Sequence, residues 1–213
     1  MNRVNSNLIS ELAQDLQPVR SFRTSDGMLL AAAAMAASVV FVALFHGLWN
    51  GALQGSASPF FYMANGLLVM FGIACAANVV RMASPSVGNR YSGAYWQLAM
   101  LAVFPAVALA SALAGGNMSE VLADPFGVKC MLAGTAVGLF TAAGLAAWLK
   151  RGAPVDPQRA GLLTGLAAGA LGSAAYGLSC PIDTLDHVAV WHMLPVVVGG
   201  SIGRAILPRL LRW

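Results

Sequence analysis

A short polar stretch between two apolar runs holds the side chains best suited to chemistry. Residues 176–195 read YGLSCPIDTLDHVAVWHMLP and include Cys180, Asp183, Asp186, His187 and His192. Thiols and imidazoles bind transition metals such as zinc and copper, and a carboxylate can complete such a shell. A thiol also forms a disulfide with a second thiol. The stretch therefore points to redox chemistry or to metal binding.

The spacing of these residues matches no established metal signature, so His187, His192 and Asp183 are predicted only as candidate ligands. The chain contains no Walker sequence, dinucleotide fingerprint, nucleophile elbow or zinc-protease helix. Asp183 and Asp186 lie in an open connection, which does not favour a catalytic carboxylate pair. We therefore expect no enzyme activity and no cofactor.

The composition is that of a membrane protein. The chain has 213 residues, of which 58% are hydrophobic and only 9% charged, and its mean hydropathy is +0.72. Soluble domains carry roughly 25% charged residues. Apolar runs of about 18 residues or more are typical of helices that cross a bilayer, and these runs lack the period-two alternation of a barrel strand. The predicted fold class is an all-α, polytopic membrane bundle.

Six transmembrane helices are predicted. They cover residues 28–49, 60–80, 95–114, 128–149, 160–179 and 187–207. Residues 1–27 form a cytoplasmic tail, and residues 28–213 form the transmembrane domain. Glycines four residues apart, such as Gly161 and Gly165, predict close packing of the last three spans. Pro195 is expected to kink the last span.

Basic residues indicate the orientation. If the spans alternate in direction, eleven of the twelve Lys and Arg residues fall on one side, and only Lys129 falls on the other. Cytoplasmic loops carry an excess of basic residues, so both termini are predicted to be cytoplasmic. The basic residues are spread singly along the chain, which argues against direct binding of nucleic acid. The predicted location is a bacterial inner membrane, and the polar stretch then faces an oxidising periplasm.

Two of the three cysteines are predicted to lie at the same depth in the membrane. Cys130 begins the fourth span and Cys180 ends the fifth, and neighbouring spans run antiparallel, so both thiols should lie near the periplasmic boundary. A labile disulfide that acts as a redox switch, a permanent bridge and two unrelated thiols all stay open, because cysteine usage does not separate them. Cys75, in the second span, is expected to be a buried structural thiol.

Residues 8–19, LISELAQDLQPV, form a short amphipathic pattern in the tail. Apolar residues recur at three- and four-residue intervals, at Leu8, Ile9, Leu12, Leu16 and Val19. The predicted helix stops near Pro18 and is too short to span. Its polar face is acidic, unlike that of most interfacial helices. It is expected either to pack on the cytoplasmic loops of the protein or to bind a groove on a cytosolic partner.

Three stretches of the sequence resemble the NrsF-type membrane anti-sigma factors. These are LISELAQDLQPVR near the start, the stretch of residues 176–195 with its cysteine before a proline, and the closing GGSIGRAILPRLLRW. They occur in the family order, and the resemblance covers nearly the whole chain. It implies a six-span protein that holds an extracytoplasmic-function (ECF) sigma factor inactive in the cytoplasm.

The resemblance also implies roles for the singled-out residues. Paired cysteines near the outer face of the family are implicated in sensing oxidants or metal stress, and they match Cys130 and Cys180. The stripe of the amino-terminal helix would cover the surface of the sigma factor that contacts RNA polymerase core. The alternatives are a periplasmic-face transition-metal sensor with Cys and His ligands, and a small transporter.

Overall fold

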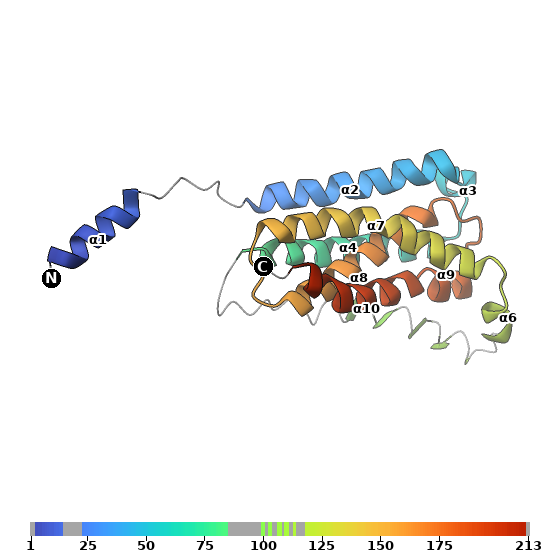
Figure 1. Ribbon diagram of the computed structural model, residues 1–213. Coiled ribbons are helices and arrows are strands. Elements are labelled where there is room, and N and C mark those ends of the chain that lie inside the picture. Colours follow the sequence, from blue (N-terminus) through green and yellow to red (C-terminus); the bar gives the residue numbers. More distant parts are fainter. Residues whose placement is uncertain are drawn as a thin grey trace.

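The computed structural model describes residues 3–14, 23–84 and 118–211, together with isolated residues between 99 and 113. The regular structure of these residues is helical, and they contain no strand. The helices are α1 Arg3–Gln14, α2 Thr24–Phe45, α3 Asn50–Leu53, α4 Pro59–Met82, α6 Met118–Leu122, α7 Gly127–Arg151, α8 Pro157–Gly177, α9 Leu185–Trp191 and α10 Leu194–Leu210. The prediction of an all-α protein is confirmed for this part of the chain (Figure 1).

Four helical segments of the described residues are long and apolar enough to cross a membrane. They are α2, α4, α7 and the segment Leu185–Leu210, which contains α9 and α10. They correspond to the first, second, fourth and sixth predicted spans. The predicted third span, 95–114, lies largely outside the described residues. The structure therefore supports four of the six predicted spans.

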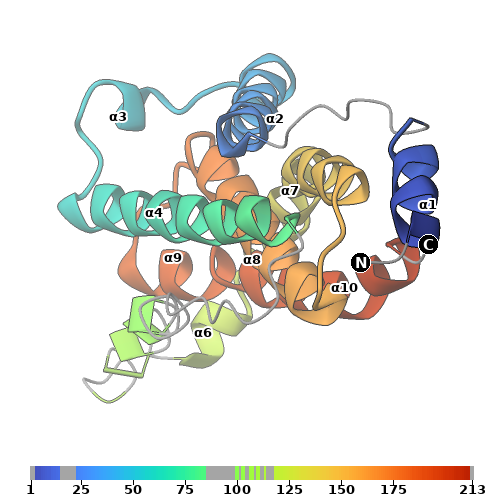
Figure 2. The same cartoon turned by 90° about the vertical axis from the view of Figure 1, so that its left-hand side faces the viewer.

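The predicted fifth span, 160–179, folds as α8, but this helix is not among those four. Its sequence is dominated by glycine and alanine, so its hydropathy is lower than that of a leucine-rich span. Most of its residues are buried against neighbouring helices, and Figure 2 shows α8 among α4, α7 and α10. A helix enclosed by protein needs small side chains more than it needs a lipid-facing apolar surface.

Glycines bring α8 and α10 into backbone contact. A Cβ atom added to Gly165 would overlap the carbonyl group of Gly199 and lie 3.0 Å from the Cα of Gly200. A Cβ atom on Gly161 would meet the carbonyl oxygen of Gly203. Small residues four apart on both helices thus permit the close approach that the sequence predicted.

Gly165→Ala should destabilise the bundle, because one added methyl group would have to push two backbones apart. Overpacking of this kind costs about 1–3 kcal/mol. The control is Gly66→Ala in α4, where an added Cβ meets no heavy atom within 4 Å. Thermal unfolding in detergent micelles should show a lower midpoint for Gly165→Ala and an unchanged or higher one for Gly66→Ala. Equal midpoints would contradict the close contact between α8 and α10.

The last predicted span is interrupted. The sequence predicted one helix with a kink at Pro195, but the structure has two, with α9 ending at Trp191 and α10 beginning at Leu194. Pro195 lies in the first turn of α10. Backbone N–H groups in the first turn have no intrahelical acceptor, so a proline is tolerated there without a kink. The Ser173 hydroxyl of α8 donates to the carbonyl oxygen of His192 at 2.6 Å, which fixes the interruption to the central helix.

The two ends of the bundle differ in composition. One end holds the start of α2 and the ends of α4, α7 and α10 (Figure 1). Basic side chains occur at this end, at Arg81, Lys150, Arg151 and Arg159. The opposite end holds α3, α6 and α9 together with the polar stretch. The helix α1 lies apart from the bundle.

Candidate functional site

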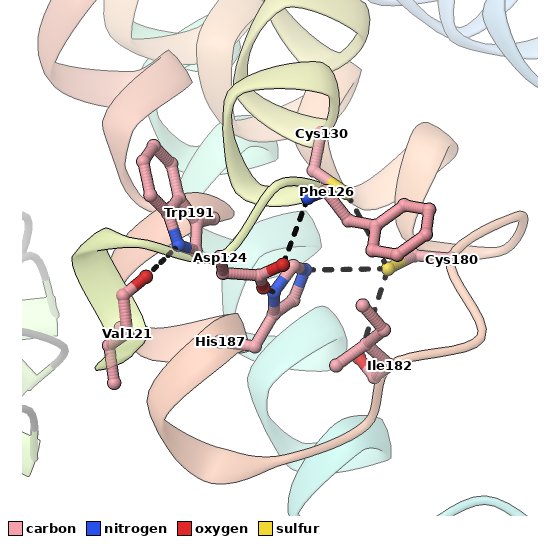
Figure 3. Close-up of polar contacts among 8 residues, drawn as sticks. All are labelled: Val121, Asp124, Phe126, Cys130, Cys180, Ile182, His187 and Trp191. Carbon is pink, nitrogen blue, oxygen red and sulfur yellow. Dashed lines mark hydrogen bonds and ion pairs between the residues drawn. The ribbon is translucent and has the colours of Figure 1, made fainter. Parts of the chain in front are cut away.

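Side chains from α7, from α9 and from the connection after α8 converge at the end of the bundle that holds α9 (Figure 3). Cys130 is in the first turn of α7, and Cys180 follows the end of α8. His187 is in α9, and His192 is its C-cap residue. All four side chains are buried. The structure thus brings together the two predicted thiols and two of the three candidate metal ligands.

Tryptophan packing holds the start of α7 against α9. The indole Nε1 of Trp191 donates to the carbonyl oxygen of Val121 at 2.9 Å. A Cβ atom on Gly127 would collide with the Trp191 ring, so only glycine allows this approach. The first turn of α7, which carries Cys130, is therefore fixed beside the helix that carries His187.

The two thiols are close but not bonded. The Sγ atoms of Cys130 and Cys180 lie 3.7 Å apart, and both cysteines are free. Their side chains are only 6% and 2% exposed. Cys75 is also buried and free, in the half of α4 toward the other end, as expected for a structural thiol.

Asp124, His187 and Cys180 form a chain of polar contacts. The Nδ1 of His187 lies 2.6 Å from the Oδ2 of Asp124, and its Nε2 lies 3.5 Å from the Sγ of Cys180. The other carboxylate oxygen of Asp124 accepts from the backbone N–H of Phe126 at 2.9 Å. Because a carboxylate only accepts hydrogen bonds, the Nδ1 of His187 donates, and its Nε2 is left to accept the proton of the Cys180 thiol, which would produce a thiolate beside an imidazolium.

This environment favours the thiolate of Cys180. A hydrogen bond from the Cys130 thiol lowers the pKa of Cys180, and the neighbouring imidazole rings of His187 and His192 lower it further. Burial opposes these contacts but does not reverse them. A lowered pKa raises the fraction of the nucleophilic form at neutral pH. Cys180 is thus suited to react with an electrophilic oxidant.

A cavity of about 200 Å³ reaches both thiols. It is lined by His46, Phe126, Lys129, Cys130, Tyr176, Ser179, Cys180, Pro181 and Ile182. Phe126, Lys129 and Pro181 are exposed residues, so the lining extends from the surface to the buried sulfur atoms. The cavity is a route by which a small molecule or ion can reach Cys130 and Cys180.

Asp183 is not part of this group. Its Oδ2 accepts from the backbone N–H of Ser58 at 2.7 Å, at the N-cap of α4. The carboxylate beside the histidines is that of Asp124, which the sequence analysis did not single out. Asp124 belongs to the connection before α7 and is 63 residues from His187. No spacing signal in the sequence distinguishes it from Glu120 in the same connection.

The predicted partner-binding residues are only partly described. Ile9 and Leu12 lie on α1 and are 66% and 63% exposed. Leu8 lies on the same helix. Leu16 and Val19 lie outside the described residues. The helix begins at Arg3, earlier than predicted, and the described helix ends at Gln14.

Comparisons with known proteins identify the family. Residues 12–213 match the family NrsF, described as negative regulator of sigma F. The anti-sigma-F factor NrsF of Caulobacter vibrioides (strain NA1000 / CB15N) is 41% identical over 70 residues, which cover 32% of this chain and 33% of that protein. The probable anti-sigma-F factor NrsF of Azospira oryzae (strain ATCC BAA-33 / DSM 13638 / PS) is 32% identical over 65 residues, 30% of each chain.

The aligned stretches thus span about a third of the length of these curated relatives. No solved structure matches the chain. The family match is far more extensive, because it covers residues 12–213 and so includes Asp124, both thiols and both histidines of the site. The chain therefore belongs to the NrsF family.

Proposed function

We propose that the chain is a membrane-embedded anti-sigma factor that holds an ECF sigma factor inactive and releases it under oxidative stress. The family match over residues 12–213 carries this proposal, because the family is described as a negative regulator of sigma F. The names of the two relatives support it. Four apolar helices suit an anchor in the inner membrane of a bacterium.

The charge distribution supports an orientation. The end of the bundle with Arg81, Lys150, Arg151 and Arg159 faces the cytoplasm by the positive-inside rule. Both termini are then cytoplasmic, where a sigma factor acts. The thiols face the periplasm, where disulfides form and persist. Signal and output thus lie on opposite sides of the membrane.

The helix α1 supplies a binding surface for the sigma factor. Ile9 and Leu12 are three residues apart, lie on one side of the helix and are exposed. An amphipathic helix lays such side chains into an apolar groove of its partner. Leu8, Leu16 and Val19 extend the stripe in the sequence. A sigma factor whose groove is filled in this way cannot use that groove to contact RNA polymerase core.

Oxidation of the two thiols is the signal. The Cys180 thiolate attacks one oxygen of hydrogen peroxide, the O–O bond breaks, one water leaves after protonation, and Cys180 becomes a sulfenic acid. The Cys130 sulfur, 3.7 Å away, then attacks the Cys180 sulfur. The S–O bond breaks and a second water leaves with the Cys130 proton. The thiols lose two electrons, and the peroxide gains them.

A disulfide here would move helices. The distance between the sulfur atoms must fall from 3.7 Å to about 2.05 Å. Cys130 is in the first turn of α7, which runs to Arg151 at the other end, so a displacement at the sulfur shifts a whole helix. A tenfold loss of sigma affinity requires about 1.4 kcal/mol of coupling. One disulfide typically stabilises a protein by about 2–4 kcal/mol, so the magnitude is sufficient.

Co-purification tests the proposal. The full chain in detergent micelles should retain one sigma factor from a panel of ECF sigma factors under reducing conditions. Peroxide should release that sigma factor, and a reductant should restore its binding. Retention of no sigma factor in either state would contradict the anti-sigma function. Equal retention in both states would contradict oxidation as the signal and leave the anti-sigma function standing.

A further inference from the structure

The side chains of Cys130, Cys180, His187 and His192 form a four-ligand group. Their ligating atoms all lie within 4.8 Å of one another, and all four residues are buried. Two cysteines and two histidines are a ligand set of structural zinc sites. We propose that this group is a tetrahedral binding site for Zn²⁺, reached through the cavity of about 200 Å³ that contacts both thiols.

The distances fit a tetrahedral ion. With Zn–S bonds of about 2.3 Å and Zn–N bonds of about 2.05 Å, tetrahedral angles place two sulfur ligands about 3.8 Å apart and a sulfur and a nitrogen about 3.6 Å apart. The Sγ atoms of Cys130 and Cys180 are 3.7 Å apart. The Sγ of Cys180 and the Nε2 of His187 are 3.5 Å apart. These two distances match a tetrahedral ion, and the ligating atoms of all four residues lie within 4.8 Å of one another, so the side chains need to move inward to surround one ion.

His192 gives an independent indication of a ligand. Its side chain is 2% exposed, and its Nε2 is buried with no hydrogen-bond partner among the described residues. A buried polar atom without a partner destabilises the fold, and such atoms are rare in native structures. His192 lies beside His187, with ring centroids 5.6 Å apart. Coordination of an ion by the Nε2 of His192 would satisfy this nitrogen.

Asp124 completes the arrangement around the ligands. Metal-bound histidines usually donate their second ring N–H to a carboxylate or carbonyl, which fixes the tautomer and the ring orientation. The contact of 2.6 Å between Asp124 and the Nδ1 of His187 is of this kind, and it directs the Nε2 toward Cys180. Asp124 is thus a positioning residue, and its own oxygen atoms are engaged by His187 and by the N–H of Phe126.

The donor set selects the ion. Thiolate and imidazole ligands suit Zn²⁺, whereas Mg²⁺ and Ca²⁺ prefer oxygen ligands. Two thiolates also neutralise the charge of a divalent ion, which lowers the cost of holding it in a buried position. The site shares its thiols with the proposed redox signal but does not depend on sigma binding. A bound ion and a disulfide exclude each other, because each uses both sulfur atoms.

Cobalt titration tests the site directly. The full chain in detergent micelles, reduced with a phosphine, should bind one Co²⁺ per chain and develop the thiolate charge-transfer and visible d–d bands of tetrahedral cobalt. One equivalent of Zn²⁺ should remove these bands. Absence of the charge-transfer band, or a spectrum typical of octahedral cobalt, would overturn the proposal.

Variants assign the ligands. Cys180→Ser and His192→Ala should each weaken cobalt affinity roughly 100-fold or more, and Asp124→Asn should weaken it about 10–100-fold. His46→Ala is the matched control, because His46 lines the same cavity but is not in the group. His192→Gln removes the same ligand with a polar side chain in its place. Size-exclusion profiles of both His192 variants show whether the chain is still folded, which separates ligand loss from misfolding. Unchanged affinity in both His192 variants would overturn the four-ligand site.

The two proposals fail separately. Leu12→Asp should lose sigma retention while its cobalt spectrum stays that of the unaltered chain, because α1 lies apart from the site. A chain that retains the sigma factor but binds no cobalt would remove the metal site alone. A chain that binds cobalt but retains no sigma factor would remove the anti-sigma function alone.

Discussion

Cys180→Ser should keep the sigma factor bound after a peroxide treatment that releases it from the unaltered chain. Serine has no thiolate, so neither the sulfenic acid nor the disulfide can form at this position. The response should fall to the level without oxidant. Co-purification before and after peroxide measures it, and mass spectrometry of the intact chain reports whether two hydrogen atoms are lost, as a disulfide requires.

Cys130→Ser separates the two steps of the same reaction. Its Cys180 should still be oxidised to a sulfenic acid, detectable with a sulfenic-acid probe, but no disulfide should form and the sigma factor should stay bound. Cys75→Ala is the control, because this thiol is buried in α4 and is not among the residues of the site. A Cys130 or Cys180 variant that still responds fully to peroxide would remove the redox mechanism.

Leu12→Asp should abolish retention of the sigma factor in either redox state. Burying a leucine contributes about 1.5–3 kcal/mol, and an aspartate in the same groove adds the cost of a buried charge. The combined loss is about 3 kcal/mol or more, which is at least roughly 100-fold in Kd. Titration with the labelled sigma factor measures this change.

Gln14→Asp is the matched control for Leu12→Asp. It places the same residue on the same helix, but Gln14 lies on the side opposite Ile9 and Leu12 by helical spacing. Both variants should unfold at the temperature of the unaltered chain, because both positions are exposed. If Leu12→Asp retains the sigma factor as well as Gln14→Asp does, the assignment of α1 as the binding helix is wrong.

Much of the site follows from topology that the sequence reveals. The antiparallel order of the fourth and fifth predicted spans puts Cys130 and Cys180 at one level, and the structure has their sulfur atoms 3.7 Å apart. Hydropathy locates the spans, and charge gives their orientation. Because consecutive spans run in opposite directions, these two signals suffice for the argument. The same reasoning put His187 and His192 at this level.

The rest of the site depends on side-chain packing that no local pattern encodes. Asp183 is much nearer to His187 in sequence than Asp124 is, yet Asp183 accepts a hydrogen bond at the N-cap of α4, and Asp124 contacts His187 instead. The position of His192 depends on the interruption between α9 and α10, which hydropathy does not reveal because the apolar run continues across it. The low hydropathy of α8 also reflects packing, because its glycines allow close contact with other helices.

The interruption at His192 and Met193 also bears on which helix would move if a disulfide formed. A continuous helix transmits a push along its axis through its ladder of backbone hydrogen bonds, whereas α9 is a segment of seven residues joined to α10 by a turn. Neither sulfur atom lies on α9 or α10, and glycines hold α10 against α8, so formation of a disulfide would leave α10 in place. Under the proposed mechanism, α7 would then be the helix that carries the displacement from the thiols to the opposite end of the bundle.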